Sequence, residues 1–172
     1  SPRISDVGVV LDLMIRDVDI ILSMINSKLV SRSAIGRCIR TNHEDIASAQ
    51  LTFAKGAMAQ ILVSRVSEKR IRQMEITEAE RYITVNYESQ DISVQRCVRQ
   101  SGGNLVEVME HPVFPKTEPL KMELQHFVSC VRDGRQPMVG IKDGKRALEV
   151  CVAVLRQIHE EKNSAGSILS AI

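Results

Sequence analysis

The sequence predicts an α+β fold with an open, mainly antiparallel sheet of about six strands and helices packed on one face. Three observations support this: a long helical pattern opens the chain, short apolar runs separated by short turns follow, and two amphipathic helical patterns close it. Short connections require antiparallel neighbours, because parallel strands need a crossover of a dozen or more residues. The 172 residues suffice for one domain with its own core.

The first helix is predicted from Asp6, as its N-cap, to about Asn26. Its apolar residues cover an arc much wider than one stripe: Val9, Val10, Leu11, Leu13, Met14, Val18, Ile20, Ile21, Leu22, Met24 and Ile25. A helix with so wide an apolar arc is normally enclosed by its own domain.

The remaining edge of this helix carries polar residues spaced i, i+4, i+7 and i+11, namely Asp12, Arg16, Asp19 and Ser23. We call this edge the charged seam. It either lines a cleft or is the solvated side of the helix, with Arg16 bridging two carboxylates. The spacing alone favours the solvated side by about two to one, because most charge runs are solvated.

Strand patterns follow at Leu29–Arg40, Ile46–Phe53, Ala57–Val66, Arg70–Thr77, Arg81–Tyr87, Ile92–Arg99 and Leu105–Glu110. Gly56 permits the turn before the third of these, and residues 101–104 (SGGN) predict a hairpin between the last two. Several strands are apolar on both faces. One face can pack on the helices, and a second copy of the same sheet is the simplest cover for the other, which predicts a homodimer or tetramer.

Two helices close the chain. The first is predicted to be capped by Thr117, with Pro119 in its first turn, and to end at Gly134. The second is predicted from near Asp143 to about Lys162.

Composition excludes several classes of function. A net charge of +2 with few aromatic residues argues against a nucleic-acid surface, and no apolar run is long enough to span a membrane. The four dispersed cysteines are expected to be buried, reduced thiols of a cytoplasmic protein. No nucleotide-binding, hydrolase or metal-ligand motif is present, and the four histidines are expected to be solvated.

Two charged features outside the first helix have a functional and a structural interpretation. Glu44 and Asp45 precede a strand and are more typical of a turn than of a catalytic carboxylate pair. Arg65 ends an apolar strand, where it could bind an anion, although an arginine there is more often paired at the sheet edge.

Several segments in order resemble a known family. They are DLMIRDVD at residues 12–19, EDIASAQLTFAKGA at 44–57, SRVS at 64–67, EPLKMELQHFVSCVRDGRQP at 118–137 and DGKRALEV at 143–150. Together they are similar to the C-terminal domain of the glucose–fructose oxidoreductase, inositol dehydrogenase and rhizopine catabolism (Gfo/Idh/MocA) family. The resemblance implies a single domain over residues 1–172 that binds substrate and forms the oligomer, without the family's N-terminal Rossmann domain for NAD or NADP. The chain is therefore expected to be part of a longer protein.

The resemblance also implies roles for the charged seam. In the family motif Asp-x-x-x-His-x-x-Asp, the first Asp and the His line the substrate pocket, and the His commonly serves as acid or base. Asp12 and Asp19 match the two aspartates, and Arg16 stands at the His position. Because a guanidinium group stays protonated above pH 12, Arg16 cannot perform the proton transfer of a histidine. We therefore expect Arg16 at the catalytic position to be inactive as an acid or base, with Asp12, Asp19 and Arg65 as substrate-binding candidates.

Two hypotheses follow. The first is the substrate-binding and oligomerisation domain of a nicotinamide-dependent sugar or sugar-nucleotide oxidoreductase, which binds no cofactor or metal itself and is inactive alone. The second is a non-catalytic degenerate relative that serves as an interaction or scaffold module.

Overall fold

The computed structural model describes residues 6–99 and 105–169, with side chains described as far as residue 161 in the last helix. The chain forms two compact units. Unit 1 contains the residues up to Ser67 and those from Gln136 onward, and unit 2 contains Glu68–Arg135, so unit 2 is inserted into unit 1 along the chain.

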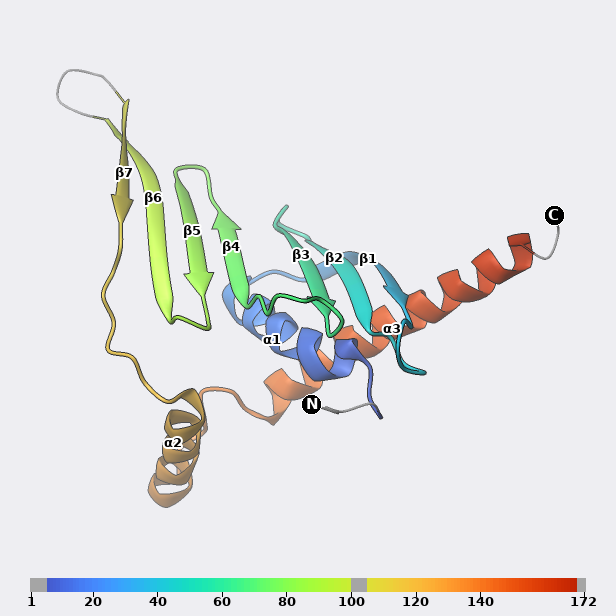
Figure 1. The fold of residues 1–172 in the computed structure, drawn as a ribbon. Helices are drawn as coiled ribbons and strands as arrows, with labels where there is room; N and C mark the ends of the chain where they lie inside the picture. Colours follow the sequence, from blue (N-terminus) through green and yellow to red (C-terminus); the bar gives the residue numbers. More distant parts are fainter. Residues whose placement is uncertain (1–5, 100–104, 170–172) are drawn as a thin grey trace. The chain divides into compact units, whose positions relative to one another are not determined.

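Unit 1 packs helices on one face of a three-stranded antiparallel sheet (Figure 1). The strands are β1 (Leu29–Arg37), β2 (Ile46–Phe53) and β3 (Met58–Ser64), and the helices are η1 (Val10–Met14), α1 (Ile15–Met24) and α3 (Ile141–Leu169). Alternate residues of the strands are buried against the helices: Ala34, Ala47, Ala49, Leu51, Phe53, Ile61 and Val63. The opening helix supplies Val9, Val10, Met14, Val18, Ile21 and Leu22 to the same core, and α3 supplies Ala147, Val150, Cys151, Val154 and Ile158.

At two positions of unit 1 the local geometry favours glycine. Gly56 has φ 88° in the β2–β3 turn, as predicted, and this region of φ favours glycine. Gly36 allows β1 to approach α3, because a Cβ there would lie 3.0 Å from Cδ1 of Ile158.

Unit 2 contains a four-stranded antiparallel sheet and one helix. The strands, in spatial order, are β4 (Gln73–Thr77), β5 (Arg81–Asn86), β6 (Asp91–Arg99) and β7 (Leu105–Glu110), and the helix is α2 (Pro119–Asp133). One sheet face carries Met74, Ile76, Ile83, Val85, Ile92, Val94, Val106 and Val108, which are all only half-buried. Among the described residues of unit 2, Cys130 is the only fully buried hydrophobic residue. This sheet is therefore open on its apolar face.

The predicted class, α+β with open antiparallel sheets, is confirmed. The hydrogen bonds of the described residues divide seven strands into sheets of three and four, where the sequence predicted one sheet of about six. The physical reason is the connection after Ser64: eight residues without strand structure precede Gln73, which is too long for the tight hairpin that joins the other neighbours. The turn predicted at 101–104 lies outside the described residues.

The predictions for the two ends of α2 and for the cysteines have mixed outcomes. Gly134 ends α2 with φ 64°, as predicted, but the prediction of a Thr117 cap is wrong. Glu118 occupies the N-cap position, and the backbone of Thr117 is bonded instead to the Gln90 side chain at 2.8 and 3.0 Å. None of the four cysteines forms a disulfide, but Cys38 and Cys97 are exposed, so the prediction of burial holds only for the other two.

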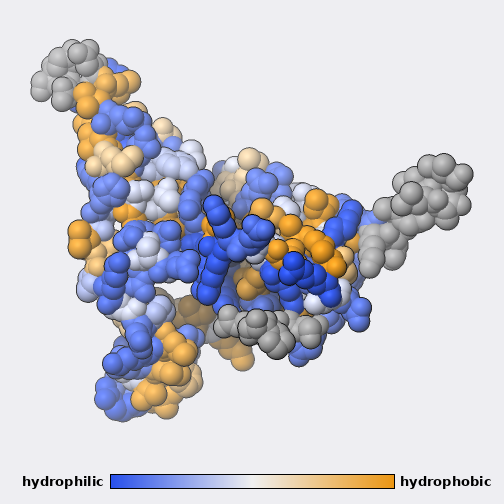
Figure 2. Space-filling view, in the orientation of Figure 1, coloured by the Kyte–Doolittle hydropathy of each residue, from blue (hydrophilic) through white to orange (hydrophobic). Residues whose placement is uncertain are grey.

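The apolar stripe of α2 is solvent-exposed. Leu120, Leu124, Phe127, Val128 and Val131 each expose more than half of their surface. Figure 2 shows apolar surface gathered along this helix. Within the described residues, no helix combines the length and apolar character that crossing a membrane requires.

Candidate functional site

The charged seam begins in the π-helical turn η1, where Asp12 lies. Its carboxylate Oδ1 is 4.0 Å from Nη2 of Arg16, one turn further along. The Arg16 side chain is 60% exposed and that of Asp12 is 23% exposed, while Asp19 is half-buried. π-turns inside helices occur frequently at functional sites. The structure therefore brings Asp12 and Arg16 together on a partly solvated edge of the helix.

The start of this helix is held by Glu44 from the loop before β2. The backbone N–H of Val9 donates to the Glu44 carbonyl at 2.9 Å, and that of Val10 donates to Glu44 Oε1 at 3.3 Å. The prediction that Asp6 caps this helix is wrong, because no residue at its N-cap position provides a side-chain bond. Glu44 is 7% exposed and fits because Gly8 has no side chain, since a Cβ there would overlap the carboxylate.

Asp45 is completely buried and organises the loop between β1 and β2. Its Oδ2 accepts the N–H groups of Ile39, Arg40 and Thr41 at 2.7, 2.6 and 2.9 Å, and its Oδ1 accepts the Thr41 hydroxyl at 2.9 Å. Burial raises the pKa of the Asp45 carboxyl, but these hydrogen bonds together lower the pKa well below its usual range. Asp45 is therefore an ionised structural residue, which agrees with the turn interpretation.

Arg65 is paired inside unit 1. Its Nε lies 3.7 Å from Oδ1 of Asp45, and its Nη2 donates to the Val7 carbonyl at 2.5 Å. Its side chain is 16% exposed. Arg65 therefore links the end of β3 to the loop and to the segment that enters the opening helix. The four candidates thus form two groups: Asp12, Arg16 and Asp19 along one helix, and Arg65 in an ion pair with Asp45.

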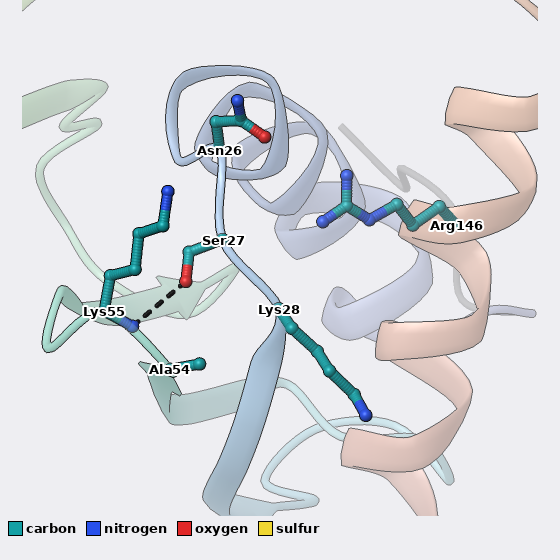
Figure 3. Close-up of a pocket in the computed structure, with 6 residues that line it drawn as sticks. All are labelled: Asn26, Ser27, Lys28, Ala54, Lys55 and Arg146. Carbon is teal, nitrogen blue, oxygen red and sulfur yellow. Dashed lines mark hydrogen bonds between the residues drawn. The ribbon is translucent and has the colours of Figure 1, made fainter.

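Unit 1 also has two adjoining surface depressions that the sequence analysis did not identify. The larger, of about 620 Å³, is lined by Asn26, Ser27, Lys28, Ala54, Lys55 and Arg146 (Figure 3). The smaller, of about 300 Å³, shares Lys28 and Arg146 and is otherwise lined by Leu22, Leu29, Arg32, Glu149, Val150 and Ala153. None of the four candidate residues lines either depression. These linings combine segments around residues 26, 55 and 146, so no local sequence signal could have found them.

The described residues provide neither a cluster of metal ligands nor the kind of strand–turn–helix unit that normally binds a dinucleotide. Within them, no group of three or more His, Cys, Asp or Glu side chains could hold a metal ion. A dinucleotide is normally held by a glycine-rich turn between a strand of a parallel sheet and a helix. Every strand pair in the described sheets is antiparallel, so the residues present do not fit that binding unit.

Comparison with known proteins places this fold. Residues 2–83, which contain the charged seam and Arg65, match the sequence model of the GFO/IDH/MocA C-terminal domain. UDP-N-acetylglucosamine 3-dehydrogenase of Acidithiobacillus ferrooxidans is 28% identical over 159 residues, which cover 90% of this chain and 51% of that protein. A solved structure of that enzyme aligns with a TM-score of 0.80 and 26% identity, over 92% of this chain and 49% of the other. The resemblance to the C-terminal domain of the Gfo/Idh/MocA family is therefore confirmed, by the family model over residues 2–83 and by these relatives over most of the chain.

Two further solved structures share the fold at lower identity. Aldose–aldose oxidoreductase from Caulobacter crescentus aligns with a TM-score of 0.67 and 22% identity over 86% of this chain and 44% of the other. Levoglucosan dehydrogenase in complex with NADH aligns with a TM-score of 0.71 and 17% identity over 87% of this chain and 48% of the other. The chain spans about half the length of the relatives it matches.

Proposed function

We propose that this chain is the substrate-binding and oligomerisation domain of a nicotinamide-dependent oxidoreductase acting on a sugar or sugar nucleotide, and that it is inactive alone. The observation that carries the proposal is the match to the C-terminal half of UDP-N-acetylglucosamine 3-dehydrogenase over 90% of this chain. The absence of a GxGxxG segment in the sequence further supports a division of labour, in which NAD or NADP would bind to a separate domain.

Within this proposal, the charged seam contributes binding and orientation of the substrate. Carboxylates of Asp12 and Asp19 can accept hydrogen bonds from sugar hydroxyls. Arg16 carries a guanidinium group, so it can pair with Asp12 or attract an anionic substrate group, but it cannot accept a hydroxyl proton. Arg65 would act indirectly, by fixing the segment before the opening helix through Val7.

Binding to the isolated chain tests the proposal. Isothermal titration should show no saturable binding of NAD or NADP and weak binding of UDP-N-acetylglucosamine. Asp12→Asn should weaken the sugar-nucleotide binding by roughly tenfold, because one charge-assisted hydrogen bond is lost. Asp91→Asn, which alters an exposed carboxylate at the start of β6, should leave it unchanged. Tight binding of NAD by this chain would contradict the proposal.

The oligomeric part of the proposal concerns the open sheet faces. The four-stranded sheet of unit 2 presents eight half-buried aliphatic or methionine side chains on one face, which a second copy would cover. Burial of apolar surface contributes roughly 25 cal/mol per Å² before the costs of association. A homodimer is therefore expected, and a tetramer would also use the outer face of the unit 1 sheet, where Ile35, Met58 and Leu62 are exposed.

One observation favours a second candidate, a non-catalytic interaction module, namely the presence of Arg16 where the family motif has a histidine. A chimera that joins this chain to the N-terminal half of the A. ferrooxidans relative separates the two candidates. An oxidoreductase domain predicts that Arg16→His in this chimera restores NADH formation from UDP-N-acetylglucosamine, measured by absorbance. A folded chimera that binds NAD but neither binds nor oxidises the sugar nucleotide, with or without this change, would favour the interaction module.

A further inference from the structure

We infer that the larger depression of unit 1 is a binding site for a small phosphorylated anion, with a diphosphate group as the chemistry that fits best. Its lining contains three cations, Lys28, Lys55 and Arg146, and no acidic residue. No ion pair within the described residues involves any of these three side chains. Three unpaired like charges around one hollow repel one another, and a multiply charged anion would relieve that repulsion.

The backbone holds the cations in place. The N–H of Ala54 donates to the Lys28 carbonyl at 2.8 Å, and the N–H of Lys55 donates to Ser27 Oγ at 3.1 Å. These bonds tie the segment after α1 to the β2–β3 turn. Arg146 is fixed independently, because the next residue of α3, Ala147, is 1% exposed in the core. The site is therefore built from three anchored segments, as phosphate sites require.

The hollow also offers uncharged donors. Figure 3 shows Lys55 and Arg146 reaching toward the Asn26–Ser27 segment from its two sides, with Lys28 extending toward α3. Because Ser27 Oγ accepts the Lys55 N–H, its own hydroxyl proton can be donated to a ligand. The Asn26 amide can donate as well. An arginine fork, two ammonium groups and two neutral donors match the oxygen-rich surface of a diphosphate.

The site is separate from the Asp12–Arg16 pair of the charged seam. From Asp12 to Met24 the helix advances by about 18 Å at roughly 1.5 Å per residue, and the depression begins beyond that helix end. One diphosphate group cannot contact both. The inference therefore does not depend on the proposed oxidoreductase function, and it adds a second ligand site to unit 1.

The lining of the smaller depression indicates which of the two depressions would hold the anion. It contains Glu149, whose Oε1 is 3.8 Å from Nζ of Lys145, together with apolar side chains. A carboxylate disfavours a bound anion, so the phosphates belong in the larger depression. The shared residues Lys28 and Arg146 would then leave the smaller depression for an uncharged part of the ligand.

The test is isothermal titration of the 172-residue chain with inorganic diphosphate at low salt, with orthophosphate and uridine diphosphate as further arms. We expect saturable submillimolar binding of diphosphate that weakens several-fold in 0.3 M salt, because exposed charges are screened. Lys28→Gln and Arg146→Gln should each weaken it by about tenfold, the loss expected for one charge-assisted contact. Arg156→Gln, a matched change further along α3, should leave it unchanged, as should Asp12→Asn.

Tighter binding of uridine diphosphate than of inorganic diphosphate, abolished by the same two variants, would support the site and show that a nucleoside adds to it. Lack of saturation by diphosphate at millimolar concentration would overturn the inference. So would equal losses in Arg156→Gln and Arg146→Gln. A lower melting temperature for Lys28→Gln with unchanged diphosphate binding would also overturn it, because the lysine would then serve only the negative end of the α1 dipole.

Discussion

Gly8 is the residue that allows a distant carboxylate to reach the start of the opening helix. We predict that Gly8→Ala destabilises unit 1 by about 1–3 kcal/mol, because the new Cβ would displace the Glu44 side chain. Glu44→Ala should cost about 1 kcal/mol through loss of the bond to Val10. In the Glu44→Ala background, Gly8→Ala should cost much less. Chemical denaturation of the four proteins measures the cycle, and additive losses would contradict the overlap.

Asp45 should make stability depend on acid pH. Its pKa in the folded protein lies below the usual unfolded value of about 3.9, so its stabilisation is complete above that value and is lost as pH falls below it. Asp45→Asn should lower the melting temperature at pH 7 and should also flatten its decline between pH 5 and pH 3. Thermal melts followed by circular dichroism measure both effects. The exposed-site variant Asp91→Asn should keep the wild-type slope, and parallel curves for Asp45→Asn would contradict the prediction.

The cysteines should divide into two reactivity classes. Cys38 and Cys97 are exposed, whereas Cys151 is fully buried and burial raises its pKa to about 11. We predict that a thiol reagent modifies Cys38 and Cys97 rapidly at pH 8 in the native protein, and that it reaches Cys130 and Cys151 only on unfolding. Mass spectrometry of labelled peptides identifies the sites. Rapid native labelling of Cys151 would contradict the packing of α3.

The helices α2 and α3 have a similar spacing of apolar residues, but the apolar side of α2 is exposed and that of α3 is buried. Leu124 on α2 is 57% exposed, and Ile158 on α3 is 3% exposed. We predict that Leu124→Ala changes the free energy of unfolding by less than about 0.5 kcal/mol, whereas Ile158→Ala costs about 2–5 kcal/mol. Denaturant unfolding of the two variants provides the comparison. Equal losses would mean that α2 is covered in solution.

The strand pattern was largely predictable because it depends on neighbours in sequence. Ile46–Phe53 and Leu105–Glu110 have the predicted bounds, and Gly56 and Gly134 occupy the predicted turn and helix end. The N-termini of the opening helix and of α2 were not predictable from local signals, whereas α3 begins at Ile141, two residues before the predicted start. The Glu44 carboxylate accepts the N–H of Val10 in the opening helix, 34 residues away in sequence. The Gln90 side chain accepts the N–H of Thr117, 27 residues away. The local pattern of apolar residues contains no information about hydrogen-bond partners that are so far apart in sequence.

The positions of the candidate residues relative to one another were predictable only where they are close in sequence. The i, i+4 spacing of Asp12 and Arg16 correctly predicted their proximity, because a helix turn sets it. The pairing of Arg65 was one of two stated alternatives, and Asp45 as its partner required the fold. The basic depression required three segments to meet, which neither spacing nor composition encodes.

At the scale of the molecule, the proposed homodimer can be tested on one strand. Ile83 lies on the apolar face of β5 and Thr84 on the opposite face, because successive side chains alternate. We predict that Ile83→Lys shifts the protein from dimer to monomer in sedimentation velocity at micromolar concentration, while Thr84→Lys leaves the dimer intact. Circular dichroism confirms that both variants keep their folded secondary structure. A monomeric wild type would contradict the proposal.

The insertion of unit 2 into unit 1 has a consequence for biosynthesis. The core of unit 1 needs α3, which begins at Ile141, more than a hundred residues after β1 ends at Arg37. At a translation rate of about 5–20 residues per second, the ribosome needs roughly 5–20 seconds to synthesise the intervening chain. During that interval β2 and β3 are synthesised, but the strands lack their closing helix, so Ala34, Leu51 and Phe53 are accessible to chaperones or to neighbouring nascent chains. Unit 1 can therefore reach its native state only after unit 2 and the start of α3 have been synthesised, so this chain order leaves its core uncovered for that interval.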